Sequence, residues 1–179
     1  MRHKSFSDQQ CPIARSLERV GEWWSILVLR EAFLGARRFD DFRKNLNIAP
    51  NTLTKRLNAL VEAGVFERRR YSERPPRDHY ALTEAGRDFR PVMWALLAWG
   101  NKHFAPEGPA VRVVDAETGA VADPVLVDRA TLRPLRSPEF RSAAGPAADA
   151  TTRSRHARAA SSAGVSCADG LSCDGSQNV

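Results

Sequence analysis

The sequence predicts a mainly α-helical fold with a small β wing, an α+β winged helix-turn-helix. Three observations support this prediction. Apolar residues recur at helical spacing through the first half of the chain. A tight turn separates two of these helices, and a loop with two prolines then joins two short strand-like runs. A long apolar helix follows, and a small β-hairpin appendage and a disordered tail complete the expected order.

The first helix is expected over residues 13–20, because its apolar positions repeat at helical spacing. Pro12 precedes it, at a position where a first helical turn tolerates proline. The segment 23–34 is apolar on most faces and is followed by Gly35, so we expect a largely buried central helix that ends there. A short third helix is expected to start with Asp40 as its N-cap.

The fourth helix is expected from Pro50 to Ala63, with Gly64 as its stop signal. Its leucines form one apolar stripe, which leaves the polar residues of the first turns outside that stripe. Residues 65–71 and 79–83 can then pair as strands around the loop 72–78. This pairing would form the wing.

A long helix is expected after the wing, capped by Thr83 and reaching about Phe104, with a kink at Pro91. Its apolar residues cover more of the circumference than one core-facing stripe requires. The second apolar face predicts a partner helix.

Three parts are expected along the chain. Residues 1–104 would form one domain that contains the helix-turn-helix, the wing and the long helix. Residues 105–141 contain β-branched runs with turn residues between them, which favours a small β-hairpin appendage. Residues 142–179 are mostly Ala, Ser, Gly and Arg, so this tail is expected to be disordered for lack of apolar residues to bury.

Positive charge is concentrated in the first part of the chain. Residues 1–104 hold 19 Lys+Arg against 12 Asp+Glu, whereas the remainder holds 8 against 9. A basic domain suits a polyanionic partner, although charge that only keeps the domain soluble is a rival interpretation. The three cysteines form neither a paired framework nor a metal-binding motif, and no segment resembles a signal peptide or a membrane span. A cytoplasmic protein is expected.

Several short motifs occur in order along residues 9 to 104. Together they resemble the HxlR-type winged-helix regulators, and the ordered series is more specific than a helix-turn-helix pattern alone. Two positions depart from the family pattern, since Ala49 stands where a serine cap is frequent and Trp23 where a lysine is frequent. The motifs are Cys11–Arg15, Gly21–Trp24 with Leu27, Leu29–Glu31, Arg37–Phe39, Leu53 with Arg56–Leu57, Glu62–Gly64, Pro75–Arg77, Tyr80 with Leu82–Thr83, and Trp99–Gly100.

The resemblance implies a bacterial homodimer that binds double-stranded DNA. The first and last helices would form the dimer interface, the helix before the wing would enter the major groove, and the wing would contact flanking DNA. Some family members sense oxidants or electrophiles through a cysteine that matches Cys11. An oxidant or small-molecule effector is therefore an expectation for this chain.

The expected DNA-binding residues lie at the start of the fourth helix and at the wing tip. An ordinary solvated face of an amphipathic helix is the alternative for the first group, and a charged edge strand is the alternative for the second. The wing arginines alternate in direction, which favours the two at its tip as phosphate or minor-groove contacts. The residues are Pro50, Asn51, Thr52, Thr54, Lys55, Arg56, Arg74 and Arg77.

Cys11 lies at a helix start, where the helix dipole and Arg15 would favour a reactive thiolate. An inert, partly buried cysteine is the alternative. Trp94 and Trp99 could line an effector pocket, or they could belong to the core or to an interface.

No arrangement of residues predicts catalysis, a metal site or a cofactor. The four histidines are scattered, and no nucleophile, metal-ligand pair or phosphate-binding loop stands at a meaningful spacing. The expected function is that of a sequence-specific DNA-binding regulator, with repression as the expected outcome. A protein-interaction module and a ligand- or flavin-binding module are the two alternatives.

Overall fold

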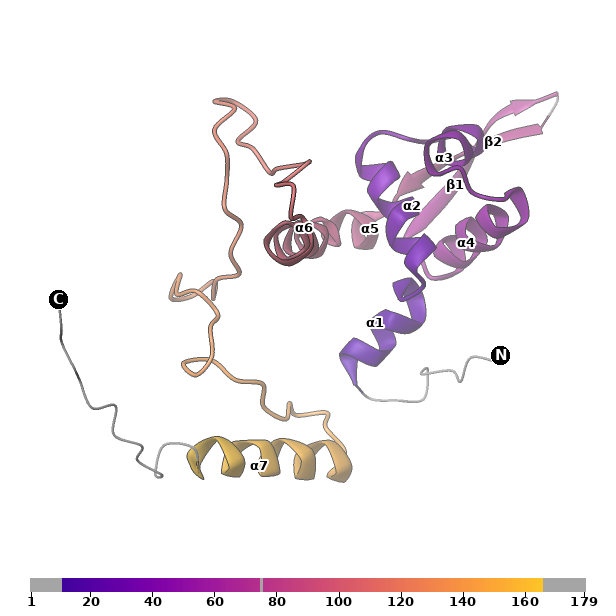
Figure 1. Cartoon of the computed structure of the whole chain (residues 1–179). Helices are drawn as coiled ribbons and strands as arrows, with labels where there is room; N and C mark the ends of the chain where they lie inside the picture. Colours follow the sequence, from indigo (N-terminus) through magenta and orange to yellow (C-terminus); the bar gives the residue numbers. More distant parts are fainter. Residues whose placement is uncertain (1–10, 75, 166–179) are drawn as a thin grey trace. The chain divides into compact units, whose positions relative to one another are not determined.

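The computed structural model describes residues 11–74 and 76–165. The chain divides into two units, residues 1–135 and residues 136–179. The first unit contains six helices and one two-stranded sheet among its described residues, and the second contains a helix (Figure 1). In order, the elements are α1 (Pro12–Val20), α2 (Trp23–Phe33), α3 (Phe39–Leu46), α4 (Pro50–Glu62), β1 (Phe66–Glu73), β2 (Pro76–Leu82), α5 (Glu84–Asp88), α6 (Arg90–Phe104) and α7 (Ala150–Val165).

The first four helices confirm the predicted pattern. Pro12 stands in the first turn of α1, and Cys11 is its N-cap residue. After α2 and α4 the chain reverses at Gly35 (φ 103°) and Gly64 (φ 70°), left-handed conformations that glycine adopts without steric cost. The ends of both helices are therefore set by residues visible in the sequence.

The N-cap predicted for α3 is wrong. The helix begins at Phe39, one residue before Asp40, so Asp40 lies inside its first turn. Asp41 instead accepts hydrogen bonds from the backbone N–H groups of Arg38 (3.0 Å) and Arg37 (3.4 Å). The carboxylate thus satisfies free N–H groups at the helix start from within the helix.

The core of the first unit lies where α2, α3 and α4 meet the sheet. Phe42, Phe66 and Tyr80 form an edge-to-face triad with ring centroids 6.3–6.5 Å apart. The leucine stripe of α4 (Leu53, Leu57 and Leu60) is completely buried. This packing fixes α4 on its apolar side and leaves its opposite side in solvent. Trp23, at the start of α2, is largely exposed, so that end of the helix is less buried than predicted.

The wing has longer strands and a shorter loop than predicted. Antiparallel pairing continues past Arg70 to Ser72–Arg77 and Glu73–Pro76, with an irregularity between Arg70 and Ser72. Most of the expected loop 72–78 therefore belongs to the strands. A bridge from Arg38 to His79 and a hydrogen bond from the Tyr80 N–H to the Arg37 carbonyl (2.7 Å) join the hairpin to the chain before α3.

The expected long last helix is two helices. Thr83 caps α5 as predicted, accepting a hydrogen bond from the Gly86 N–H (3.1 Å). The helix then breaks at Phe89, and Pro91 lies in the first turn of α6. Proline lacks an N–H group and fits a helix start better than a helix interior, so it begins a new helix where a kink was predicted.

Residues 105–135 form two small hairpins, where the sequence suggested one. Each β-branched run folds on itself, with a single bridge from Val114 to Val121 and another from Val127 to Pro134. In the first turn Asp115 accepts hydrogen bonds from the Thr118 N–H and hydroxyl, and Asp128 has the same partners in Thr131. These bonds lower the pKa of both aspartates.

The expectation of disorder from residue 142 is wrong for α7, while residues 166–179 lie outside the described part. Asp149 caps α7 by accepting a hydrogen bond from the Thr152 N–H (2.7 Å), and this bond lowers the pKa of Asp149. The helix is rich in alanine and arginine, which have high helix propensity. Local propensity and capping therefore account for a helix that builds no apolar core.

Candidate DNA-binding surface

The start of α4 presents a polar face to solvent. Asn51, Thr54 and Lys55 are exposed and Thr52 is half-buried, while the intervening Leu53 is buried. Pro50 begins the helix and is exposed too, and the Thr54 hydroxyl donates to its carbonyl (2.9 Å). The first turn contains no acidic residue, so the positive end of the helix dipole and the Lys55 ammonium act together on this surface.

The turn between α3 and α4 holds α4 in place. Asn47 adopts the left-handed conformation (φ 47°) at the end of α3, and Ile48 is buried in the core. A short connection with one buried anchor leaves the second helix of the pair little freedom to move. This arrangement is the helix-turn-helix.

Arg56 lies apart from the other predicted DNA-binding residues of α4. Its side chain is 25% exposed and forms an ion pair with Glu22 (3.7 Å), just before α2. Its Nε atom is buried and has no hydrogen-bond partner among the described residues. The side chain thus ties α4 to the N-terminal end of α2 in this structure.

Acidic partners divide the wing arginines into two groups. Arg68 and Arg70 both face Asp78, at 3.6 Å and 3.2 Å, and Asp78 raises the pKa of Arg70. Arg69 pairs with Glu67. Arg74 and Arg77 are exposed at the wing tip, and neither forms an ion pair with any carboxylate in residues 11–74 and 76–165. The tip arginines are the ones left available for phosphates.

A stacked cluster stiffens the wing and was not predicted from the sequence. The rings of Tyr71 and His79 stack with centroids 5.9 Å apart, and the Arg38 guanidinium lies 5.0 Å from the centre of the Tyr71 ring. Arg38 comes from the start of α3, so the cluster joins two elements distant in sequence. A lone tyrosine and a lone histidine carry no periodic signal that could have revealed it.

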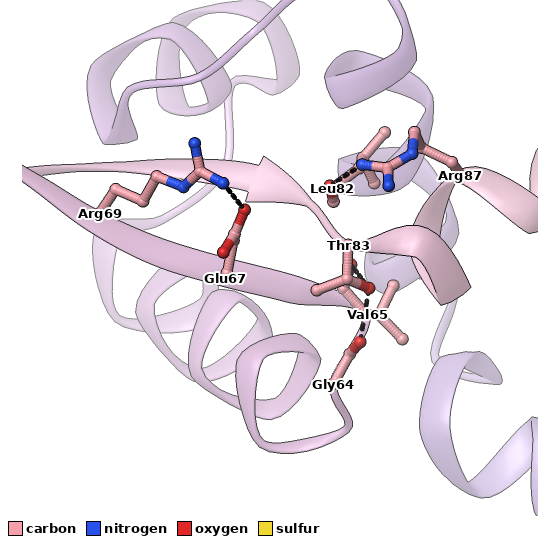
Figure 2. A network of polar contacts seen from close by, with 7 residues as sticks. All are labelled: Gly64, Val65, Glu67, Arg69, Leu82, Thr83 and Arg87. Atoms are coloured by element: carbon pink, nitrogen blue, oxygen red, sulfur yellow. Dashed lines mark hydrogen bonds and ion pairs between the residues drawn. The ribbon is translucent and has the colours of Figure 1, made fainter.

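The wing and α4 are locked together at their common base (Figure 2). The Thr83 hydroxyl points at the carbonyls of Gly64 (2.6 Å) and Val65 (3.1 Å), immediately after α4. Arg87 of α5 donates to the Leu82 carbonyl (2.8 Å) at the end of β2. These bonds connect the end of α4, the base of both strands and α5, so that the wing is attached firmly to the helix-turn-helix.

Cys11 is exposed, whereas its position in the sequence did not show whether it is exposed or partly buried. It is the N-cap residue of α1, and its carbonyl accepts a hydrogen bond from the Arg15 N–H (3.0 Å). The partial burial of the alternative interpretation is therefore not observed, and reactivity of Cys11 stays a prediction. Cys167 and Cys173 lie outside the described residues.

Exposed apolar side chains mark α1 and α6. On α1 these are Ile13 and Leu17, and on one side of α6 they are Val92, Leu96 and Trp99. None of the α6 residues, all of which the structure describes, is fully buried. Exposed apolar surface of this extent is typical of an interaction site.

The described residues contain neither a helix long and apolar enough to cross a membrane nor a group of three metal-binding side chains.

Comparison with known proteins gives consistent relatives. The family model of the HxlR-like helix-turn-helix matches residues 19–108. An uncharacterized HTH-type transcriptional regulator of Mycobacterium tuberculosis is 47% identical over 116 residues, covering 64% of this chain and 73% of that protein. The regulator YdeP of Bacillus subtilis is 36% identical, covering 52% of this chain and 73% of that protein.

Solved structures extend the similarity beyond α6. PA1374, a candidate transcription factor of Pseudomonas aeruginosa, is 52% identical with a TM-score of 0.61, covering 81% of this chain and 99% of that structure. PA1607, another candidate transcription factor, is 35% identical with a TM-score of 0.71, covering 79% of this chain and all of that structure. From its exposed helix-turn-helix, its wing and these relatives, the chain belongs to the HxlR-like helix-turn-helix family of transcriptional regulators.

Proposed function

We propose that this protein acts in the cytoplasm as a homodimeric repressor that binds a pseudo-palindromic operator. In each protomer the start of α4 enters a major groove, and Arg74 and Arg77 contact the phosphates or the minor groove beside it. Base contacts from Thr52 and Lys55 supply specificity, and Asn51 binds a base or a phosphate.

One observation carries this proposal. The buried leucines of α4 leave Asn51, Thr54 and Lys55 facing solvent, and the tip arginines of the wing have no acidic partner in the described residues. In the wing, Asp78 and Glu67 pair with Arg68, Arg69 and Arg70, while Arg74 and Arg77 have no carboxylate partner among the described residues. Unpaired arginines suit a phosphate backbone because they release condensed counterions on binding, and a helix N-terminus suits it through its free N–H groups.

Exposed apolar side chains support the dimer. Leu17 of α1 and Leu96 and Trp99 of α6 would become buried if the two helices met their counterparts in a second copy. Two α4 helices related by a two-fold axis would then enter successive major grooves about 34 Å apart. Repression follows where such a site overlaps a promoter, because the bound dimer excludes RNA polymerase.

Regulation through an oxidant or a small electrophile belongs to the same proposal. Cys11 is exposed at the start of α1, the helix proposed to contact the partner copy. A modified thiol there would alter the packing of α1 and, through the interface, the spacing of the two α4 helices.

Nuclease footprinting on the DNA flanking the protein's own gene tests this function, with competitor DNA present. A protected stretch with two-fold symmetry that survives the competitor is the expected result. The binding constant should fall by about 0.9 logarithmic units per contacted phosphate for each tenfold rise in salt concentration. Uniform binding that the competitor abolishes would favour a protein-interaction module.

A further inference from the structure

Residues 105–135, which we call the arm, contain the same small hairpin twice. In both copies an aspartate accepts hydrogen bonds from the N–H and hydroxyl of the threonine three residues later. The next residue has a positive φ in both, Gly119 at 71° and Leu132 at 56°. We call residues 113–122 hairpin A and residues 126–135 hairpin B. A repeated turn of this kind is a built element and not an arbitrary loop conformation.

Hairpin A lies against α6 without closing the space between them. The Asn101 side chain donates a hydrogen bond to the Val111 carbonyl (2.9 Å), which attaches the arm to the helix. A cavity of about 570 Å³ that is open to solvent remains, lined by Leu97, Ala98 and Trp99 of α6 and by Val113, Val121 and Pro124 of the arm. Its lining also includes the polar residues Asn101, Lys102, Arg112 and Asp123. The exposed part of its lining is mainly apolar, so the cavity can accept apolar side chains.

Hairpin B also has apolar side chains, and no described residue of its own chain covers them. Leu126 is 61% exposed and Leu132 73% exposed, and Val127 and Leu135 are also exposed. Asp123 and Pro124, which link the two hairpins, already line the cavity. Hairpin B therefore lies outside the cavity of its own chain.

We infer that hairpin B of one protomer fills the cavity between α6 and hairpin A of its partner. The inference rests on the proposed dimer. Trp99 both lines the cavity and is 54% exposed beside Val92 and Leu96, so the cavity lies next to the proposed dimer face of α6. A two-fold axis there makes the exchange reciprocal, and each hairpin B occupies the partner's cavity.

The occupant is a second copy of this chain because the filler and the hollow are both already present in it. A small apolar ligand would fill the cavity but would leave Leu126 and Leu132 of hairpin B in solvent. The reciprocal exchange buries both surfaces at once, without any added component.

Sedimentation equilibrium of the full-length chain tests this inference without DNA. Leu126→Asp and Leu132→Asp should each raise the dimer dissociation constant at least tenfold, because each replaces an apolar side chain that would be buried against a mainly apolar lining with a charged one. Leu34→Asp is the matched control, since Leu34 is 74% exposed at the end of α2 and does not line the cavity, so its substitution should change nothing. Wild-type-like dimerisation of both arm variants would overturn the inference and leave the proposed dimer standing. A monomeric wild-type chain would overturn both.

Directed disulfide formation locates the contact. In a background with Cys11, Cys167 and Cys173 replaced by serine, a chain carrying Leu132→Cys is mixed with one carrying Leu97→Cys and oxidised mildly. The mixed disulfide should dominate over either homodimer, while a Leu34→Cys chain mixed with the Leu97→Cys chain should give none. Absence of the mixed disulfide in a sample that dimerises would overturn the proposed site. Specific DNA binding by the wild-type chain is measured separately and tests the proposed function alone.

Discussion

Side-chain direction on α4 decides which residues can meet DNA. Thr52 and Lys55 lie on the polar side, near the N-terminal end that enters a groove first, whereas Arg56 turns back to Glu22. Arg74 lies at the wing tip, where groups contact the backbone more often than bases. The two groups should therefore differ in what their removal changes.

Lys55→Ala and Thr52→Ala should reduce the preference for operator over random DNA, because each lost base contact is worth roughly 1–3 kcal/mol. Arg74→Ala should instead weaken binding to both DNAs alike and flatten the salt dependence. Equilibrium titrations of the three variants against both DNAs measure this. Unchanged preference in the α4 variants would show that α4 is not the recognition helix.

Exposure makes Cys11 testable as an oxidant sensor. In a protein lacking Cys167 and Cys173, mild peroxide or diamide should change operator affinity at least several-fold, and reductant should restore it. The tail cysteines are removed because their cross-linking could imitate the effect. The comparison protein also carries Cys11→Ser, and an equal response of both proteins would reduce Cys11 to a structural residue.

Among the elements, the junction of α4, the wing and α5 depends on one close approach. A Cβ added to Gly86 would stand 2.3 Å from the Val65 carbonyl oxygen and 3.3 Å from its carbonyl carbon. The Val65 carbonyl accepts a hydrogen bond from the Thr83 hydroxyl, so moving this carbonyl away from residue 86 would weaken that bond. The sequence shows only a glycine in a helix, which would ordinarily be expected to weaken that helix.

Gly86→Ala should destabilise the protein by roughly 1–3 kcal/mol, because overpacking outweighs the gain of about 1 kcal/mol in helix propensity. Thermal unfolding measures the effect. Gly145→Ala is the control, since a Cβ there meets nothing within 4 Å. An alanine at residue 86 that leaves stability unchanged would show that α5 shifts freely against the β1 strand.

Elements governed by local signals could be predicted from the sequence. The leucine stripe and Gly64 gave α4 nearly to the residue, because helical periodicity and a left-handed stop are both local. Errors arose where two local solutions compete. Asp40 and Asp41 can each cap a helix, and a β-branched run can pair with its neighbour or fold on itself.

Features that depend on distant partners could not be predicted. The orientation of Arg56 follows from the place of Glu22. Arg74 and Arg77 were favoured from their place at the wing tip, but the pairing of Arg68 and Arg70 with Asp78 was not predicted. The family resemblance indicated which region is the candidate site. The structure showed which arginines of that region pair with carboxylates.

At the scale of the whole molecule, residues 136–179 form a unit of their own. Removing residues 142–179 should leave dimerisation and operator affinity nearly unchanged, because α7 builds no apolar core. Sedimentation and operator titration of the truncated chain check this. A large loss of affinity would show that Arg153, Arg155 and Arg158 contribute phosphate contacts.

The central claim is that two copies of α4 enter successive major grooves of one operator. Asn51→Cys in a background without the other cysteines allows an iron chelate that cleaves DNA to be attached at the exposed start of α4. Bound to its operator, the labelled protein should cut at two symmetric positions about one helical turn apart, near 34 Å. Cleavage at a single position, or none on a DNA that the protein demonstrably binds, would contradict the account.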